Sequence, residues 1–287
     1  MLVLDGALQC AEKDEAGYHE LITHVAVCRK GISGGSRKRA LIIGGGDGGA
    51  ARELLRHDDV ESVELIDIDG EVMKAAKEML PSIWKHPGSS SEGKYKLMDD
   101  DPRFKIRVEN GLDFVMQKAT GASAGGDGGY DIIVVDASDP VGPGKALYST
   151  DFYGALKKCL RPGGAVTVQG GSFVYLPLVF RVVHAGLSAV FPIVKAYSCH
   201  TQIYPGGVWN LHCATLGDDP AEVDEDKAEA LAKDHQLKYY SAGVHRASFV
   251  LPPIAQAELR KPAPSLDECS THLEGIMTGN VKAGTKL

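Results

Sequence analysis

Short apolar runs alternate with stretches of helical periodicity over most of the chain. Seven runs have the length of buried strands: 40–43, 62–67, 104–108, 131–136, 164–169, 192–198 and 209–215. Because buried strands that alternate with helices form parallel sheets, this pattern predicts an α/β fold. We expect a doubly wound, mostly parallel Rossmann-like sheet with helices on both faces.

The two ends of the chain depart from this alternation. Residues 2–14 predict a short β-hairpin that turns at Asp5-Gly6, and residues 15–28 have the apolar spacing of a helix. Residues 254–287 lose periodicity and indicate a mobile tail. We therefore expect a hairpin over 1–14, one main domain over 15–253 and a C-terminal tail over 254–287.

A glycine-rich turn follows the first buried strand. Gly44, Gly46 and Gly49 match the pattern G-x-G-x-x-G, and a helix-forming segment begins at Ala50. A strand, a glycine turn and a helix N-terminus in this order are typical of a nucleotide site. Asp47 lies inside the turn, where its carboxylate would repel a pyrophosphate. The turn therefore favours a ligand that carries a positive charge.

Acidic and amide residues follow three further strands. Asp67 ends the second strand, Asn110-Gly111 follows the third, and Asp136 and Asp139 follow the fourth. Taken singly, such residues are common at loop starts and helix N-caps. Together they lie at the edge where parallel strands end, which predicts one shared site. Two neighbouring carboxylates there can hold an ammonium group, and one can accept a proton.

Composition narrows the class of protein. The 287 residues carry a net charge of −7, which disfavours nucleic acid as a partner and fits cationic ligands weakly. Neither a run of about 18 apolar residues nor a signal-peptide pattern occurs, so we expect no membrane segment. The six cysteines are scattered without metal-binding spacing, which is typical of a reducing, cytoplasmic setting. The histidines show no metal pattern, and we expect no metal.

Several motifs, in order along residues 2–252, resemble the polyamine aminopropyltransferases, and most closely the spermidine synthases. They are Leu2-Val3-Leu4-Asp5-Gly6 with Gln9, Asp14-Glu15 with Tyr18-His19-Glu20, the Gly44–Gly49 turn, Asp136–Pro140 with Gly142-Pro143, Tyr204-Pro205-Gly206-Gly207, and Leu237–Tyr240 with His245–Phe249. The resemblance implies a methyltransferase-type Rossmann-like fold. It also implies transfer of an aminopropyl group from decarboxylated S-adenosylmethionine, a co-substrate, to putrescine, which gives spermidine and methylthioadenosine without a bound cofactor.

The resemblance also implies roles for particular residues and a homodimer. Asp67 would bind the ribose, Asn110 and Gly111 the adenine, Asp47 the donor ammonium, and Asp136 would accept the proton. The amine site would be lined by Tyr18, His19, Asp139 and Tyr204, and Pro143 would contact ligand from a closing loop over 141–150. From the residues alone, His19 fits a helix surface, Tyr204 a turn, and Trp209 the core.

The sequence departs from the family at three points. Asn110 stands where Asp is common, Gly171 stands where Glu is common, and only the last hairpin of the N-terminal β domain is present. Alternatives therefore stay open: spermine or thermospermine synthesis, putrescine N-methylation, or an inactive regulatory paralogue. A nicotinamide-dependent oxidoreductase and an N-methyltransferase are both disfavoured by Asp47, which would face a phosphate or the carboxylate of the intact donor.

Overall fold

A computed structural model describes residues 1–4, 6–32, 37–88, 96–121 and 129–278. Its centre is one seven-stranded sheet with the strand order β5-β4-β3-β6-β7-β9-β8. The strands are β3 (Lys38–Gly44), β4 (Val60–Asp67), β5 (Phe104–Val108), β6 (Tyr130–Asp136), β7 (Leu160–Gln169), β8 (Ile193–His200) and β9 (Val208–Thr215). Each contains most or all of one strand predicted from the sequence, and the α/β prediction is confirmed.

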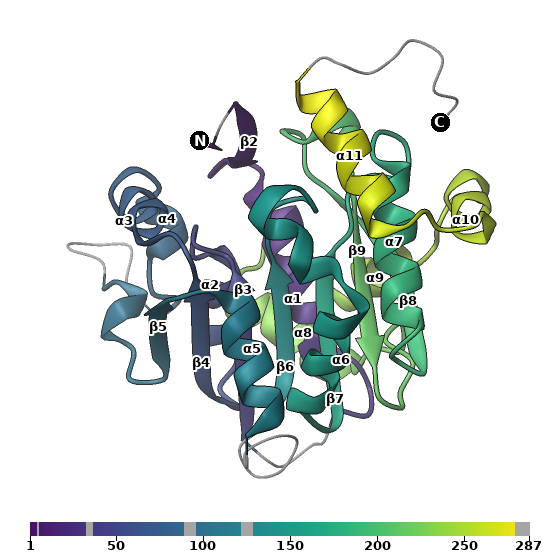
Figure 1. Cartoon of the computed structure of the whole chain (residues 1–287). Helices are drawn as coiled ribbons and strands as arrows, with labels where there is room; N and C mark the ends of the chain where they lie inside the picture. The colour runs from purple at the N-terminus through teal and green to yellow at the C-terminus, as the bar shows by residue number, and fades with distance from the viewer. Residues whose placement is uncertain (5, 33–36, 89–95, 122–128, 279–287) are drawn as a thin grey trace.

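The direction of the strands decides where a site can form. β3 lies between β4 and β6 and pairs in parallel with both, and the pairs β4–β5 and β6–β7 are parallel as well. β9 runs antiparallel between β7 and β8. The parallel strands therefore end at one edge of the sheet, the upper edge in Figure 1. Loops that follow these strands meet there, as in other open α/β sheets.

Helices cover both faces of the sheet because its strands are apolar on both sides (Figure 1). In β3, Ala40 and Ile42 face one core while Leu41 and Ile43 face the other. The first core takes side chains from α1 (Glu15–Cys28), α2 (Gly49–Leu55), α3 (Gly70–Met79), α4 (Pro81–Trp84), α8 (Glu225–Asp234) and α9 (Ala242–Ser248). The second takes them from α5 (Gly111–Thr120), α6 (Thr150–Cys159), α7 (Pro177–Ser188) and α11 (Leu266–Met277).

Helix α1 is buried along its whole length. It packs against both the sheet and α2, so even its polar residues, Glu15, His19 and Glu20, are removed from solvent. The helix predicted over 15–28 is confirmed. A polar residue in such a helix needs a partner, since an unpaired buried polar group is destabilising.

The N-terminal hairpin is a separate two-stranded sheet. β1 (Leu2–Leu4) pairs antiparallel with β2 (Ala7–Cys10), as predicted. Its last residue, Cys10, packs against Leu80 and against Ile83 of α4. The hairpin therefore lies at the same edge of the sheet as the strand ends (Figure 1).

The C-terminal part differs from the prediction. Instead of a tail without regular structure from residue 254, the described part holds α10 (Pro253–Arg260) and α11, whereas 279–287 lie outside the described residues. Cys269 and Leu273 of α11 are buried in the second core. The helix begins with a capping box between Ser265 and Glu268. Among the described helices, none has the length and apolar character needed to cross a bilayer.

Candidate active site

The carboxylates predicted from the strand ends come together around the glycine turn. β3 lies between β4 and β6, so Asp67 at the end of β4 and Asp136 at the end of β6 flank the turn. A Cβ atom at Gly46 would lie 2.6 Å from Asp67 Oδ2, and one at Gly45 would lie 3.4 Å from Asp136 Oδ2. Asp47 lies in the turn itself, which places three acidic side chains at one edge of the sheet.

The turn needs glycine for two reasons. Gly44 and Gly45 have φ values of 81° and 69°, which side chains strain to adopt. A Cβ atom at Gly44 would also overlap the backbone of Asp136, and one at Gly49 would overlap the imidazole of His19. The glycines therefore let β3 approach β6 and let α1 place His19 against the turn.

Asp136 has the surroundings of a proton acceptor. It is half-buried, and its Oδ1 accepts a hydrogen bond of 2.6 Å from the Tyr18 hydroxyl. Burial and the neighbouring charge of Asp47 raise the pKa of Asp136 to about 6, although His19 and the Tyr18 hydroxyl act in the opposite direction. A carboxylate with this pKa is ionised at neutral pH and is a better base than an ordinary aspartate.

Asp47 is held in its ionised form. Its Oδ1 accepts from the backbone N–H of Gly49 at 2.8 Å, and its Oδ2 lies 3.2 Å from His19 Nε2. Burial opposes the charged carboxylate, but the imidazolium of His19 outweighs it and lowers the pKa of Asp47 to about 2. The two neighbouring carboxylates thus differ in acidity, since the pKa of Asp47 is lowered and that of Asp136 is raised.

A second group of polar residues lies after β6 and β7. Asp139 accepts a hydrogen bond of 3.2 Å from Gln169 Nε2, and burial raises its pKa. Gln169 Oε1 in turn accepts from Trp209 Nε1 at 3.2 Å. The Tyr204 ring packs 4.6 Å from the Trp209 ring and 5.9 Å from that of Tyr18. These ring contacts connect Tyr18, which bonds Asp136, with Trp209, which bonds Gln169 beside Asp139.

The residues that the sequence predicts to bind the nucleoside part of the donor differ in the contacts they make. Asp67 Oδ1 accepts from the Asp69 backbone at 2.9 Å, and burial raises its pKa. Asn110 Oδ1 caps α5 by accepting from the backbones of Leu112 and Asp113. The capping role therefore applies to Asn110 in this structure, and adenine contacts from Asn110 and Gly111 stay a prediction. Pro143 is exposed in the 3₁₀ segment η2 (Gly142–Tyr148).

One group of described residues has the composition of a metal site. Ligand atoms of Cys10, His19 and Asp47 lie within 4.8 Å of one another. However, both ring nitrogens of His19 face carboxylates, since Nδ1 also lies 2.7 Å from Glu15. An imidazole bonded to two carboxylates carries both protons and has no lone pair for a metal. The group is therefore an ion-pair arrangement.

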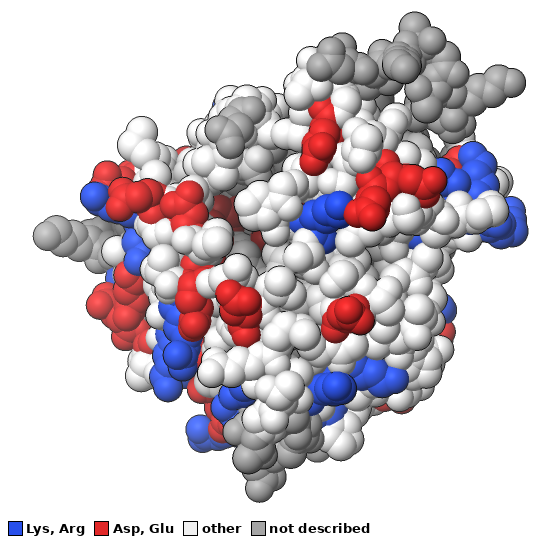
Figure 2. All heavy atoms as spheres, in the orientation of Figure 1, with Lys and Arg blue, Asp and Glu red and all other residues white. Residues whose placement is uncertain are grey.

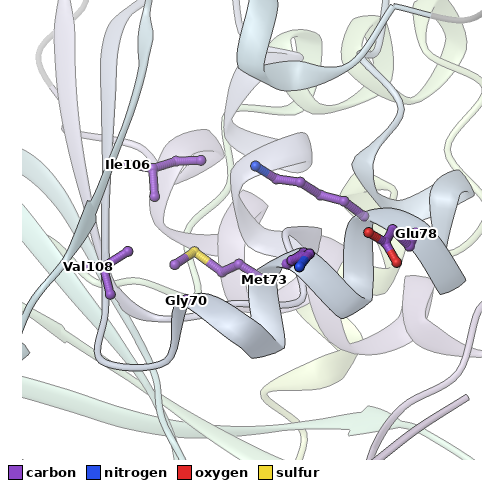
Figure 3. Close-up of a pocket in the computed structure, with 7 residues that line it drawn as sticks. Gly70, Met73, Glu78, Ile106 and Val108 are labelled. Atoms are coloured by element: carbon purple, nitrogen blue, oxygen red, sulfur yellow. The ribbon is translucent and has the colours of Figure 1, made fainter.

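The surface around the site is acidic and uneven. Figure 2 shows a recess in the upper part of one face with acidic side chains around it. A shallow pocket of about 280 Å³ lies at the outer edge of the sheet between α3 and β5 (Figure 3). Met73, Ile106 and Val108 give it an apolar lining. This pocket lies beyond Asp67 along the sheet, and neither Asp47 nor Asp136 lines it.

Some residues at the site were not identified from the sequence. Glu15 and Arg52 bond each other 37 positions apart in the chain, and no local pattern marks such a pair. Gln169 ends the buried stretch of β7, and an amide side chain at a strand end was the available signal. Trp209, expected in the core, is buried but donates to Gln169 beside Asp139.

Comparison with known proteins agrees with this geometry. Residues 15–226 match the family described as the spermine/spermidine synthase domain. A polyamine aminopropyltransferase of Moorella thermoacetica is 35% identical over 262 residues, which are 91% of this chain and 83% of that protein. The polyamine aminopropyltransferase of Bacillus subtilis is 34% identical and covers 88% of this chain and 81% of its own length.

Solved structures give the same result. A crystal structure of spermidine synthase in complex with the transition-state analogue AdoDATO has a TM-score of 0.77 and 35% identity, over 90% of this chain and 80% of that one. The spermidine synthase of Thermotoga maritima has a TM-score of 0.75 and 34% identity, over 90% and 79%. Sequence and fold therefore agree that this chain belongs to the spermine/spermidine synthase family, the polyamine aminopropyltransferases.

Proposed function

We propose that this chain transfers the aminopropyl group of decarboxylated S-adenosylmethionine to putrescine, forming spermidine and methylthioadenosine. The observation that carries this proposal is the unequal pair of carboxylates at the glycine turn, Asp47 and Asp136. A donor that has lost its carboxylate ends in an ammonium group, which a permanent anion at Asp47 attracts. The intact donor carries a carboxylate there, which Asp47 repels.

The chemical step places demands on the acceptor side. Putrescine is a dication near neutral pH, and an ammonium has no lone pair. Asp136 takes a proton from one amine, whose lone pair then attacks the carbon beside the sulfonium. The carbon–sulfur bond breaks, its electron pair stays on sulfur, and a neutral thioether leaves. Because no negative charge develops on the leaving group, the carboxylates and correct positioning are sufficient for the step.

The acceptor's other end has a separate set of residues. Asp139, with its hydrogen bond to Gln169, and the rings of Tyr204 and Trp209 offer a carboxylate and aromatic faces to a second ammonium. Gly171 has a φ of 70°, and a Cβ there would lie 3.2 Å from both Leu176 and Val179. The family's common Glu is therefore replaced by a residue that this backbone favours, and one acidic group is absent near the amine.

Product analysis tests the proposal. Purified protein is incubated with the decarboxylated donor and, separately, putrescine, longer diamines and spermidine, with Asp136→Asn as the low-activity control. We expect spermidine and methylthioadenosine in equal amounts, with putrescine the preferred acceptor. Preferential formation of spermine or thermospermine would show that the acceptor is spermidine and not putrescine. Formation of N-methylputrescine from the intact donor would overturn the proposal. An absence of turnover with every pair would favour a regulatory paralogue.

A further inference from the structure

His19 is held by carboxylates on both sides of its ring. Its Nε2 lies 3.2 Å from Asp47 at the site, and its Nδ1 lies 2.7 Å from Glu15, one helical turn earlier on α1. The exposed fractions are 2% for His19 and 4% for Glu15. Glu15 is thus the buried partner of His19, and His19 contacts Asp47, the carboxylate that we propose binds the donor.

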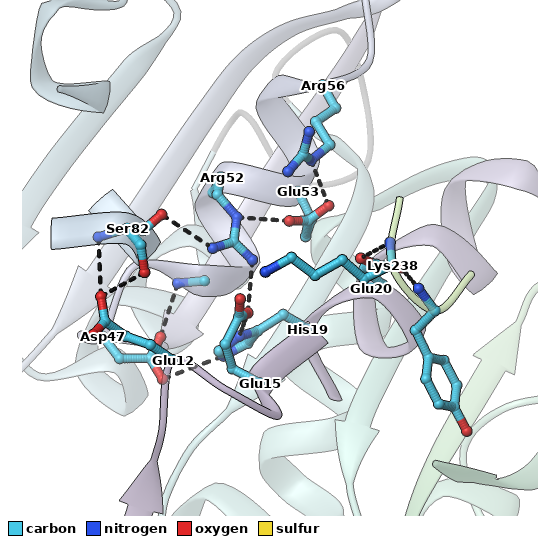
Figure 4. A network of polar contacts seen from close by, with 12 residues as sticks. Glu12, Glu15, His19, Glu20, Asp47, Arg52, Glu53, Arg56, Ser82 and Lys238 are labelled. Carbon is cyan, nitrogen blue, oxygen red and sulfur yellow. Dashed lines mark hydrogen bonds and ion pairs between the residues drawn. The ribbon is translucent and has the colours of Figure 1, made fainter. Parts of the chain in front are cut away.

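Glu15 is itself fixed by a chain of alternating charges. The oxygen that bonds His19 also accepts from Arg52 at 2.6 Å, and Arg52 donates to Glu53 at 2.7 Å. Glu53 accepts from Arg56 at 2.7 Å. Figure 4 shows this row of side chains running from the glycine turn along the interface of α1 and α2. Such charge-assisted bonds restrict the position of each member.

The surroundings of His19 explain why two carboxylates are needed. The charged and titratable groups that face it among the described residues are Asp47 in the turn, Glu15 and Tyr18 on its own helix, Cys10 from β2 and Asp136 from β6. Burial favours the neutral imidazole, but Asp47 and Glu15 outweigh it and raise the pKa of His19 well above its usual value. When a donor ammonium approaches Asp47, it competes with His19 for that carboxylate. Glu15 does not face this competition.

We propose that Glu15, anchored by Arg52, is a positioning residue that keeps His19 oriented and charged so that Asp47 stays ionised and fixed while it binds the donor. Glu15 does not contact the substrates and acts through His19. The effect of Glu15 on the KM for the donor rests on the proposed function, whereas the charge of His19 can be measured without a substrate. Either expectation can therefore fail without the other.

The first test measures the charge of His19 directly. Imidazole resonances are followed by NMR against pH in the wild type, in Glu15→Gln and in Glu20→Gln. Glu20 is a matched control because it is also buried on α1 but, among the described residues, accepts from the backbones of Lys238, Tyr239 and Tyr240 and not from His19. We expect the titration of His19 to move down toward its ordinary range in Glu15→Gln and to stay in place in Glu20→Gln. An unchanged titration in Glu15→Gln would overturn the proposal.

The second test asks whether Glu15 acts through His19. Glu15→Gln should raise the KM for the donor about tenfold, the size of one lost charge-assisted hydrogen bond, and change kcat less. In a His19→Gln background the same change should add little, because the partner is gone. Full additivity of the two effects would contradict the proposal.

A different variant applies if Glu15→Gln does not fold. Glu15→Asp keeps the charge but withdraws the carboxylate from Nδ1, so we expect a smaller downward shift of the His19 titration. A His19 titration that stays at its wild-type position in Glu15→Asp would overturn the proposal equally. Thermal melting of all variants separates a loss of fold from a change of charge.

Discussion

At the scale of single residues, the site depends on carboxylates whose environments give them different acidities. Asp47 has a pKa lowered to about 2 beside His19, whereas Asp136 has one raised to about 6 by burial and by Asp47. Two neighbouring carboxylates whose pKa values are shifted in opposite directions usually have separate roles. We propose that Asp47 binds a cation and that Asp136 accepts a proton.

Replacement of Asp136 tests the second role. Asp136→Asn keeps the shape and removes the basicity, so kcat should fall by about 10²–10⁴-fold. Affinity for the donor should fall less, because Asp47 and Asp67 remain. Asp139→Asn is the matched variant and should act mainly by raising the KM for the acceptor. Steady-state kinetics with both substrates varied measure these changes in kcat and KM. Near-normal turnover in Asp136→Asn would show that Asp136 is not the proton acceptor.

The pH dependence of turnover follows from the raised pKa of Asp136. The base must be deprotonated, so kcat/KM, which reports the unliganded enzyme, should fall as pH drops through about 6 and level off above it. The same limb should be missing from the residual activity of Asp136→Asn. A wild-type kcat/KM that stays constant to pH 4.5 would contradict the proposed role of Asp136.

The spacing of residues along the chain predicted only part of this site. Asp67 and Asp136 were identifiable because each ends an apolar strand, and Asp47 because it interrupts a glycine turn. Glu15 and Arg52 were not, because their pairing depends on how α1 packs against α2. The sequence allowed Asn110 either to cap a helix or to contact adenine, and in the structure its side chain caps α5.

At the scale of elements, the strands were easier to predict than the last helices. Strands buried on both faces, such as β3 and β6, are continuous apolar runs. α11 instead buries only Cys269, Ser270 and Leu273 and leaves most of its surface in water, so its apolar pattern is short. The spacing of Ser265 and Glu268 was a local signal for its start.

The packing of α11 gives a stability prediction. Leu273→Ala should lower the free energy of unfolding by about 2–4 kcal/mol, because the side chain is 4% exposed in the second core. Asp267→Ala, which removes the exposed ion pair of 2.5 Å to Lys145 in η2, should leave stability unchanged. Denaturant unfolding measures both. If Leu273→Ala unfolds like the wild type, α11 is not part of the core.

At the scale of the whole molecule, the sheet order brings distant segments to one edge. β3 is central, so the glycine turn lies between Asp67 of β4 and Asp136 of β6, and α1 reaches it from one face. The doubly wound pattern predicted this convergence because parallel strands end together. It could not predict which side chains of α1 point to the site, since the helix is buried all round and has no polar face to follow.

Donor discrimination tests the central claim most directly, because the claim is that an anionic glycine turn selects a donor with a positive arm. Calorimetry compares decarboxylated with intact S-adenosylmethionine on the wild type and on Asp47→Asn. We expect the wild type to bind the decarboxylated donor at least about tenfold more tightly, a difference of about 1.4 kcal/mol, and Asp47→Asn to narrow the gap. Equal affinity of the wild type for both donors would contradict the account.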